Sequence, residues 1–287
     1  MQERHLKAQI LSVATAVPPK FYTQEDLLKM LDLTDPRVSR LFMTTHIKKR
    51  HLFLPDTDTK LNEPQGELLK KHLNGGIEIG TAAIQKALAR AKIGLDDVGL
   101  LVVVTSTGFL LPGLSARLID HLNIHDDIQR LDIVGMGCNA GLNGLCAANN
   151  WALANPGQYA LLLCVEICSG LYVNDGTLRS SVVNSLFGDG ASAAVLKADK
   201  KPSEELYPRI EGFASHIVTD AIEAMHYDWN EAENKFSFYL HHINPYLVGA
   251  AVATPVTQLL QRFDLPKEKI SHWIVHTGGK NVISAVK

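Results

Sequence analysis

The chain has 287 residues, of which 46% are hydrophobic and 20% are charged, and its formal net charge is -2. This composition is typical of a soluble globular protein with a large core, and near-neutral charge argues against a nucleic-acid surface. The first ten residues hold no apolar stretch and no run reaches membrane-spanning length, so we expect no membrane partner. Four cysteines without metal-ligand spacing and scattered histidines indicate a cytoplasmic protein with reduced thiols and no metal site.

The N-terminal part is predicted to alternate strands and helices. Residues 8–16 read as a strand, and Thr23 with Asp26 has capping-box spacing for a helix. Residues 76–93 repeat apolar side chains at helical spacing. The continuous apolar run over residues 100–104 is typical of a strand buried on both faces. We therefore predict an α/β fold.

Residues 131–166 hold the most informative stretch. An apolar strand runs into Cys138, which has Gly137 and Gly141 beside it, and an uncharged Ala/Leu-rich segment follows that we expect to form a buried helix. A helix N-terminus lowers the pKa of a thiol, so Cys138 is predicted to be a reactive thiolate. On geometry alone it could equally be a small buried apolar residue. The other three cysteines lie inside helix or strand patterns and are predicted to be structural: Cys146, Cys164 and Cys168.

The second part of the chain repeats a pattern of the first. A charged stretch over residues 197–208 marks a boundary, which divides the chain into residues 1–200 and 201–287. The segment that ends at Gly108 and the segment ISHWIVHTGG, which reaches Gly278, both read as helix, turn, apolar strand and Thr-Gly. We therefore predict two related α/β halves. Few residues follow Gly278, so the second half is expected to be incomplete.

Three blocks together resemble one known family. VGMGCNAGLNGL, SLFGDGASAAVL and HWIVHTGG are similar to type III polyketide synthases, the chalcone synthase-like branch of the thiolase superfamily. This resemblance runs from about Ala8 to the last residue. It implies a layered α/β/α/β/α thiolase-like fold with the site between the halves. It also implies acyl transfer by decarboxylative Claisen condensation of malonyl-CoA, without a cofactor beyond coenzyme A thioesters. A homodimer is expected, with Leu111 crossing its interface.

The resemblance assigns catalytic roles to two residues. Cys138 matches the acyl-accepting nucleophile and His276, in IVHTGG, matches the catalytic histidine. We expect His276 to pair with Cys138 at rest and to donate to the enolate oxygen during decarboxylation. The asparagine that the family uses as a second donor would fall beyond residue 287, and losing one such donor typically costs about 10² to 10³ in rate. The chain by itself is therefore expected to be nearly inactive.

Binding roles are implied for four more residues. Phe187, in LFGDG, and Phe238, in FSFYL, match gate positions, while Arg37 and Arg40 match cations that face the phosphates of coenzyme A. Thr44 stands at the third cation position. Without the resemblance, the phenylalanines would be core aromatics and the arginines surface charges. The basic cluster over residues 48–51 is predicted to be solvated surface.

Three alternatives stay open on the sequence. A β-ketoacyl-acyl carrier protein synthase III-like enzyme would use the same cysteine and histidine on this fold. A papain-like hydrolase would share the Cys138 to His276 separation, but MGCNAG lacks that family's nucleophile signature. A truncated, non-catalytic relic would need neither residue.

Overall fold

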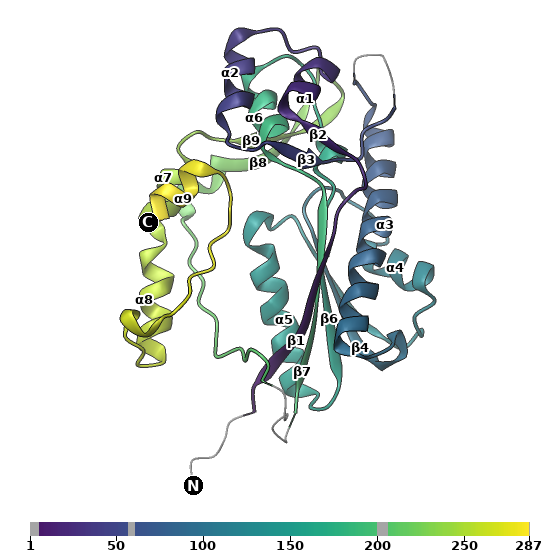
Figure 1. Cartoon of the computed structure of the whole chain (residues 1–287), viewed down its shortest axis with the longest axis vertical. Coiled ribbons are helices and arrows are strands. Elements are labelled where there is room, and N and C mark those ends of the chain that lie inside the picture. Colours follow the sequence, from purple (N-terminus) through teal and green to yellow (C-terminus); the bar gives the residue numbers. More distant parts are fainter. Residues whose placement is uncertain (1–5, 57–60, 200–205, 287) are drawn as a thin grey trace.

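A computed structural model describes residues 6–56, 61–199 and 206–286. At its centre lies a β-sheet, seen nearly edge-on in Figure 1. The sheet has five strands in the order β1-β7-β6-β4-β5. Its strands are β1 (Ala8–Ala16), β4 (Val98–Thr105), β5 (Gln129–Val134), β6 (Tyr159–Glu166) and β7 (Gly190–Ala198). Strand β4 runs parallel to its neighbours β5 and β6, whereas β7 pairs antiparallel with β6 and β1. The carboxyl ends of β4, β5 and β6 therefore lie at one edge of the sheet, where the site is built.

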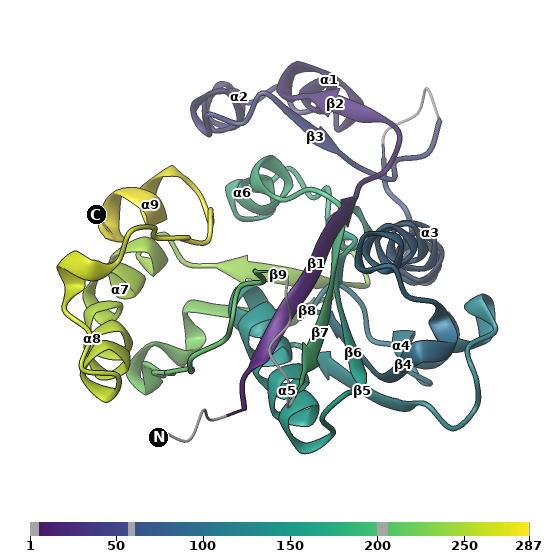
Figure 2. The same ribbon diagram turned by 60° about the horizontal axis from the view of Figure 1, so that its bottom comes forward.

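Helices cover both faces of this sheet (Figure 2). Successive side chains of a strand point to opposite faces. Leu101 and Val103 of β4 belong to a core shared with α3 (Gln65–Ala91) and α4 (Leu114–Leu122). Their neighbours Val102 and Val104 pack on the other face against α5 (Ala140–Ala154). The prediction that this strand is buried on both faces is confirmed.

The helix α5 is less buried than its sequence predicts. Ala140, Ala148 and Ala152 are enclosed on the side that faces the sheet, whereas Leu142 is 66% exposed. An uncharged helix was expected to be covered all round. In the described residues, the five-stranded sheet covers one side of α5 and no second large sheet covers the other. The described residues therefore form three layers, α/β/α, of the five layers that were expected.

A small unit packs on one end of the sheet. It contains β2 (Phe21–Thr23), α1 (Gln24–Met30), α2 (Pro36–Thr44), β3 (Lys49–His51) and α6 (Leu178–Leu186). The predicted capping box of Thr23 and Asp26 is present, and Asp35 caps α2 by accepting from the Arg37 amide. A separate core that includes Leu27, Leu31 and Phe42 holds the helices together.

The C-terminal part forms a hairpin and short helices. These elements are β8 (Met225–Asn230), β9 (Lys235–Leu240), α7 (Asn244–Ala251), α8 (Ala253–Arg262) and α9 (Lys280–Val286). Short 3-10 turns also occur at Leu95–Asp97, Gly137–Asn139, Cys168–Leu171, Thr219–Ala224 and Lys267–Lys269. The predicted division at residue 200 lies outside the described residues. No helix in the described ranges is long and apolar enough to cross a membrane.

The predicted strand before Gly278 is wrong. Residues 270–277 have no regular structure, and Ile274 is fully exposed. A strand satisfies its backbone groups through a neighbouring strand, and no described strand pairs with this segment. An apolar run forms a strand only where a neighbouring strand is available to pair with it.

Candidate active site

Cys138 lies in a tight turn between β5 and α5. Gly135 and Gly137 flank this turn with φ of 76° and 72°, a left-handed conformation that glycine adopts readily. The Gly137 amide donates to the Ser106 hydroxyl oxygen at 3.0 Å. A Cβ atom on Gly137 would lie 2.8 Å from the Met225 Cε atom. The turn is thus fitted between the end of β4 and the start of β8, and glycine is required there.

The predicted depression of the Cys138 pKa is wrong. The residue is exposed on one side, yet the protein atoms around its sulfur desolvate the thiolate and raise the thiol pKa above its ordinary value. The negative charge of Glu166 raises this pKa further, and the backbone hydrogen bond that lowers it is the smaller effect. The expected helix N-terminus is separated from the thiol, because α5 begins at Ala140 and Cys138 lies in a three-residue turn.

Glu166 is a functional candidate that the sequence analysis missed. It ends β6, and its carboxylate accepts from the Ser106 amide at 2.9 and 3.0 Å and from the Thr105 hydroxyl at 3.4 Å. Burial raises the carboxyl pKa, and the hydrogen bond from Ser106 opposes this effect. The sequence signal was a carboxylate that ends an otherwise apolar strand, YALLLCVE. Ser106 therefore links Glu166 to the turn that carries Cys138.

An aromatic wall leads from Ser106 to the predicted gate. The Tyr227 hydroxyl donates to the Ser106 carbonyl at 2.6 Å. The Tyr227 ring lies 5.3 Å from the Phe238 ring, which stacks edge-on against Phe187 at 5.8 Å. Phe109 extends the wall, at 5.8 Å from Tyr227. The structure thus brings Phe187 and Phe238 together, although their elements lie far apart in the sequence.

Arg50 holds Phe187 from behind. Its guanidinium donates to the Phe187 carbonyl at 2.7 Å, to the Tyr172 hydroxyl at 3.1 Å and to Gln24 Oε1 at 2.9 Å. Arg50 is 5% exposed. The prediction that the cluster over residues 48–51 is solvated surface is therefore wrong for Arg50. Strand alternation explains the error, because β3 turns Arg50 inward while Lys49 faces solvent.

Arg37 and Arg40 lie on the exposed face of α2. Arg37 forms an ion pair with Asp35 at 2.6 Å, and this hydrogen-bonded guanidinium lowers the carboxyl pKa. Arg40 is exposed. The Thr44 hydroxyl donates to the Arg40 carbonyl at 2.9 Å, so it is turned into its own helix. Two of the three predicted cation positions thus present a positive charge to solvent.

The predicted catalytic histidine, His276, lies in the irregular segment before Gly278. It is exposed, and its ring folds over Gly278, with Nε2 3.3 Å from the position that a Cβ atom on that glycine would take. In the described ranges, no hydrogen bond or ion pair joins His276 to Cys138. The expected resting pair is therefore not formed here, and the catalytic role of His276 stays a prediction.

A glycine-framed, exposed cysteine at the carboxyl ends of parallel strands has the chemistry of a nucleophile that can accept an acyl group. Comparison with known proteins identifies the class of enzyme. The chain matches the FAE1/type III polyketide synthase-like family over residues 39–212, and it belongs to that family.

Relatives of known name give the same result. The chain is 46% identical to 3,5-dihydroxyphenylacetyl-CoA synthase of Amycolatopsis orientalis, over 96% of this chain and 74% of the relative. It is 30% identical to 1,3,6,8-tetrahydroxynaphthalene synthase of Streptomyces peucetius subsp. caesius, over 100% of this chain and 78% of the relative. The chain thus spans about three quarters of the length of these enzymes.

Solved structures confirm the thiolase-like fold of type III polyketide synthases. PKS-I of the brown alga Ectocarpus siliculosus superimposes with a TM-score of 0.90 at 26% identity, covering 100% of this chain and 81% of the other. 1,3,6,8-Tetrahydroxynaphthalene synthase of Streptomyces coelicolor A3(2) gives 0.85 at 26% identity, covering 97% and 80%.

Proposed function

We propose that Cys138 takes an acyl group from a coenzyme A thioester and holds it as a thioester during decarboxylative condensation with malonyl-CoA. One observation carries the proposal: Cys138 is an exposed thiol in a glycine-framed turn, at the strand ends where the aromatic wall begins. The free cysteines Cys146, Cys164 and Cys168 are more enclosed. Burial raises the pKa of Cys164 and Cys168, which disfavours their thiolates.

The chemistry requires a base and a donor. Because the Cys138 pKa is raised, its thiol is mostly protonated near pH 7 and must lose its proton to be acylated. Malonyl-CoA then loses carbon dioxide, and the resulting enolate attacks the thioester carbon. A carbon-carbon bond forms, and the cysteine sulfur leaves as thiolate. We assign the base and the enolate donor to His276.

The substrate side rests on the relatives and the surface. Phe187 and Phe238 form the gate through which the acyl chain passes, and Arg37 and Arg40 face the phosphates of coenzyme A. Three relatives named 3,5-dihydroxyphenylacetyl-CoA synthase are 45–46% identical to this chain. We therefore propose 3,5-dihydroxyphenylacetyl-CoA, or a similar cyclised aromatic, as the product. No cofactor beyond the thioester substrates is proposed.

We also propose a homodimer. The edge strand β5 exposes Leu131 and Val134, at 40% and 42%, and Leu111 beside it is 98% exposed. An apolar edge strand is normally covered by a partner. Replacing Leu131 with Lys should halve the mass that light scattering measures. A parent chain that already has the mass of a monomer would contradict the dimer. We also propose a cytoplasmic location, which the free thiols support.

Acylation mapped by mass spectrometry tests the catalytic proposal. After incubation with malonyl-CoA or acetyl-CoA, the peptide that contains Cys138 should carry the acyl mass. Cys138→Ala should abolish this adduct, whereas Cys146→Ala, a neighbouring thiol on α5, should retain it. Acylation that persists in Cys138→Ala would overturn the assignment. His276→Gln should slow carbon dioxide release from malonyl-CoA, and an unchanged rate would remove His276 from the mechanism.

A further inference from the structure

The hairpin β8–β9 has two faces of different chemistry. Tyr227 and Trp229 point to one side of β8, with Phe238 opposite Tyr227 on β9. This side forms the aromatic wall. His226 and Asp228 alternate with these aromatics and therefore point to the other side. Any shift of the polar side moves the aromatic side with it, because both belong to the same six-residue strand.

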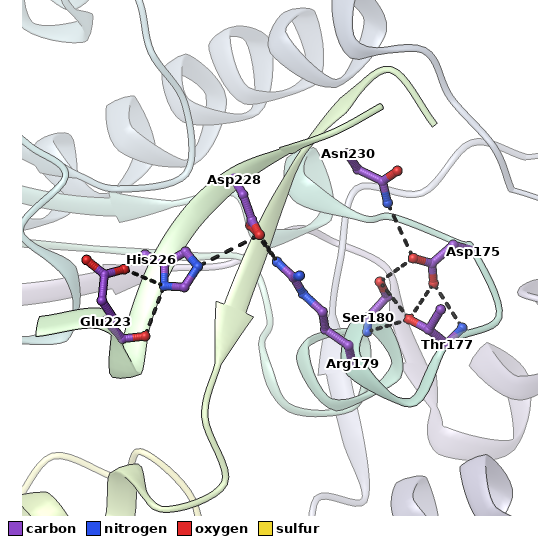
Figure 3. A network of polar contacts seen from close by, with 8 residues as sticks. All are labelled: Asp175, Thr177, Arg179, Ser180, Glu223, His226, Asp228 and Asn230. Carbon is purple, nitrogen blue, oxygen red and sulfur yellow. Dashed lines mark hydrogen bonds and ion pairs between the residues drawn. The ribbon is translucent and has the colours of Figure 1, made fainter. Parts of the chain in front are cut away.

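The polar face is fastened to α6. Arg179, the second residue of α6, forms an ion pair with Asp228 (Figure 3). Its guanidinium also lies 4.9 Å from the centre of the Tyr239 ring. The hydrogen bond from Arg179 lowers the pKa of the Asp228 carboxyl, so this partner stays charged at neutral pH. His226 Nε2 lies 3.8 Å from Asp228 on the opposite side.

A second contact ties the same two elements. Asp175 accepts from the Thr177 amide at 2.9 Å and from the Ser180 hydroxyl at 3.0 Å, which fixes the start of α6. Its carboxylate also accepts from the Asn230 side chain at 3.5 Å, at the end of β8 (Figure 3). The start of α6 therefore holds β8 at two points, Asp228 and Asn230.

Arg179 is poorly placed for the helix itself. A cation in the first turn faces the positive end of the helix dipole, which is unfavourable. The partner Asp228 offsets this, and it lies on the hairpin rather than on α6. Phe187 directly follows the last residue of α6, and the hairpin carries Phe238, so the two elements that the ion pair joins also position the two rings of the gate.

We propose that the Arg179–Asp228 ion pair, supported by Asp175 and Asn230, is a clamp that sets the spacing of Phe187 and Phe238 and so limits the length of acyl chain that the site accepts. This inference rests on the proposed function of Cys138. A two-stranded hairpin is marginally stable without tertiary contacts, so its position depends on such anchors. Arg179 and Asp228 are positioning residues, since they act through the phenylalanines.

Charge reversal tests the clamp. The variants are Arg179→Glu, Asp228→Arg and the double reversal, and Cys138 acylation is timed with acetyl-CoA and octanoyl-CoA. Each single reversal should raise the octanoyl to acetyl rate ratio by about threefold or more, with the acetyl rate within about twofold. The double reversal should restore the ratio. A ratio unchanged in both single variants, or not restored in the double, overturns the proposal.

Two further variants and a matched control complete the design. Asp228→Asn removes the negative charge without reversing it and should shift the octanoyl to acetyl rate ratio in the same direction. This variant tests the clamp even if the charge-reversal variants misfold. Lys7 and Glu211 form a long-range ion pair of similar exposure outside the hairpin, and reversing it should leave the ratio unchanged.

A fluorescence measurement separates the clamp from catalysis. Trp229 follows Asp228 in β8 and is 43% exposed. With Trp151 and Trp273 replaced by Phe, iodide quenching of Trp229 should increase in each single reversal and return in the double. If Cys138 is never acylated but the quenching of Trp229 increases in the single reversals and returns in the double, the proposed function fails. The ion pair would still be shown to set the position of the hairpin. If acylation is normal and quenching does not change, the clamp fails.

Discussion

The buried guanidinium of Arg50 supports both the small N-terminal unit and the gate. It donates three hydrogen bonds to neutral acceptors: the Phe187 carbonyl, the Tyr172 hydroxyl and Gln24 Oε1. Hydrogen bonds that involve a charged group contribute about 1.5–3 kcal/mol each, or about 4.5–9 kcal/mol for three. Burying the guanidinium costs several kcal/mol against this. We expect Arg50→Met, which keeps the apolar stem, to lower the free energy of unfolding by about 3 kcal/mol.

Urea denaturation followed by circular dichroism measures this change. Lys49→Met is the matched control, because Lys49 is the neighbour of Arg50 in β3 and its side chain faces solvent. We expect a loss below about 0.5 kcal/mol for the control. Arg50→Lys should fall in between, since one ammonium cannot span three acceptors in the geometry of the guanidinium fork. A loss under about 1 kcal/mol for Arg50→Met, or an equal loss for Lys49→Met, would refute this reasoning.

Two predictions concern titration. The raised pKa of Cys138 predicts that its alkylation by iodoacetamide, measured by peptide mass spectrometry, still accelerates above pH 9. Glu166→Gln removes a nearby negative charge and should move the midpoint of this pH profile to lower pH. An unchanged midpoint would show that Glu166 does not act on the thiol. Burial lowers the pKa of His72 from 6.5 to about 4, so the unfolded chain takes up this proton first as pH falls, and stability should decrease by about 2.5 kcal/mol from pH 7 to pH 4.5. His72→Gln should remove that part of the urea-denaturation pH profile while exposed His121→Gln keeps it, and identical profiles would contradict the assignment.

Elements with local signals could be predicted from the sequence. The strand over residues 8–16 has the predicted bounds, and the capping box of Thr23 forms as its spacing indicates. Strand β4 is buried on both faces, as its continuous apolar run predicted. The capping box is a local contact, and the two strands form where the apolar patterns coincide with the partner strands that the sheet provides.

Features that depend on distant partners were harder to predict. The apolar segment before Gly278 lacks a strand partner and stays irregular, and the uncharged α5 is covered on one side. The Cys138 pKa rises because protein atoms bury the thiol, and Glu166, 28 residues away in the chain, raises it further. Arg50 is buried because acceptors from three different segments surround it. Such effects follow from tertiary neighbours, which local patterns do not encode.

The wall beside Cys138 belongs to a different sheet from the cysteine. The turn of Cys138 follows β5 of the five-stranded sheet, whereas Tyr227 and Phe238 lie on the separate two-stranded sheet of β8 and β9. Side-chain contacts such as the bond from Tyr227 to Ser106 join the two, rather than a shared ladder of backbone hydrogen bonds. The aromatic side chains of the hairpin can therefore be exchanged without changing the strand pairing of the sheet that carries Cys138. For protein engineering, the side chains of this hairpin can be varied while the five-stranded sheet is kept unchanged.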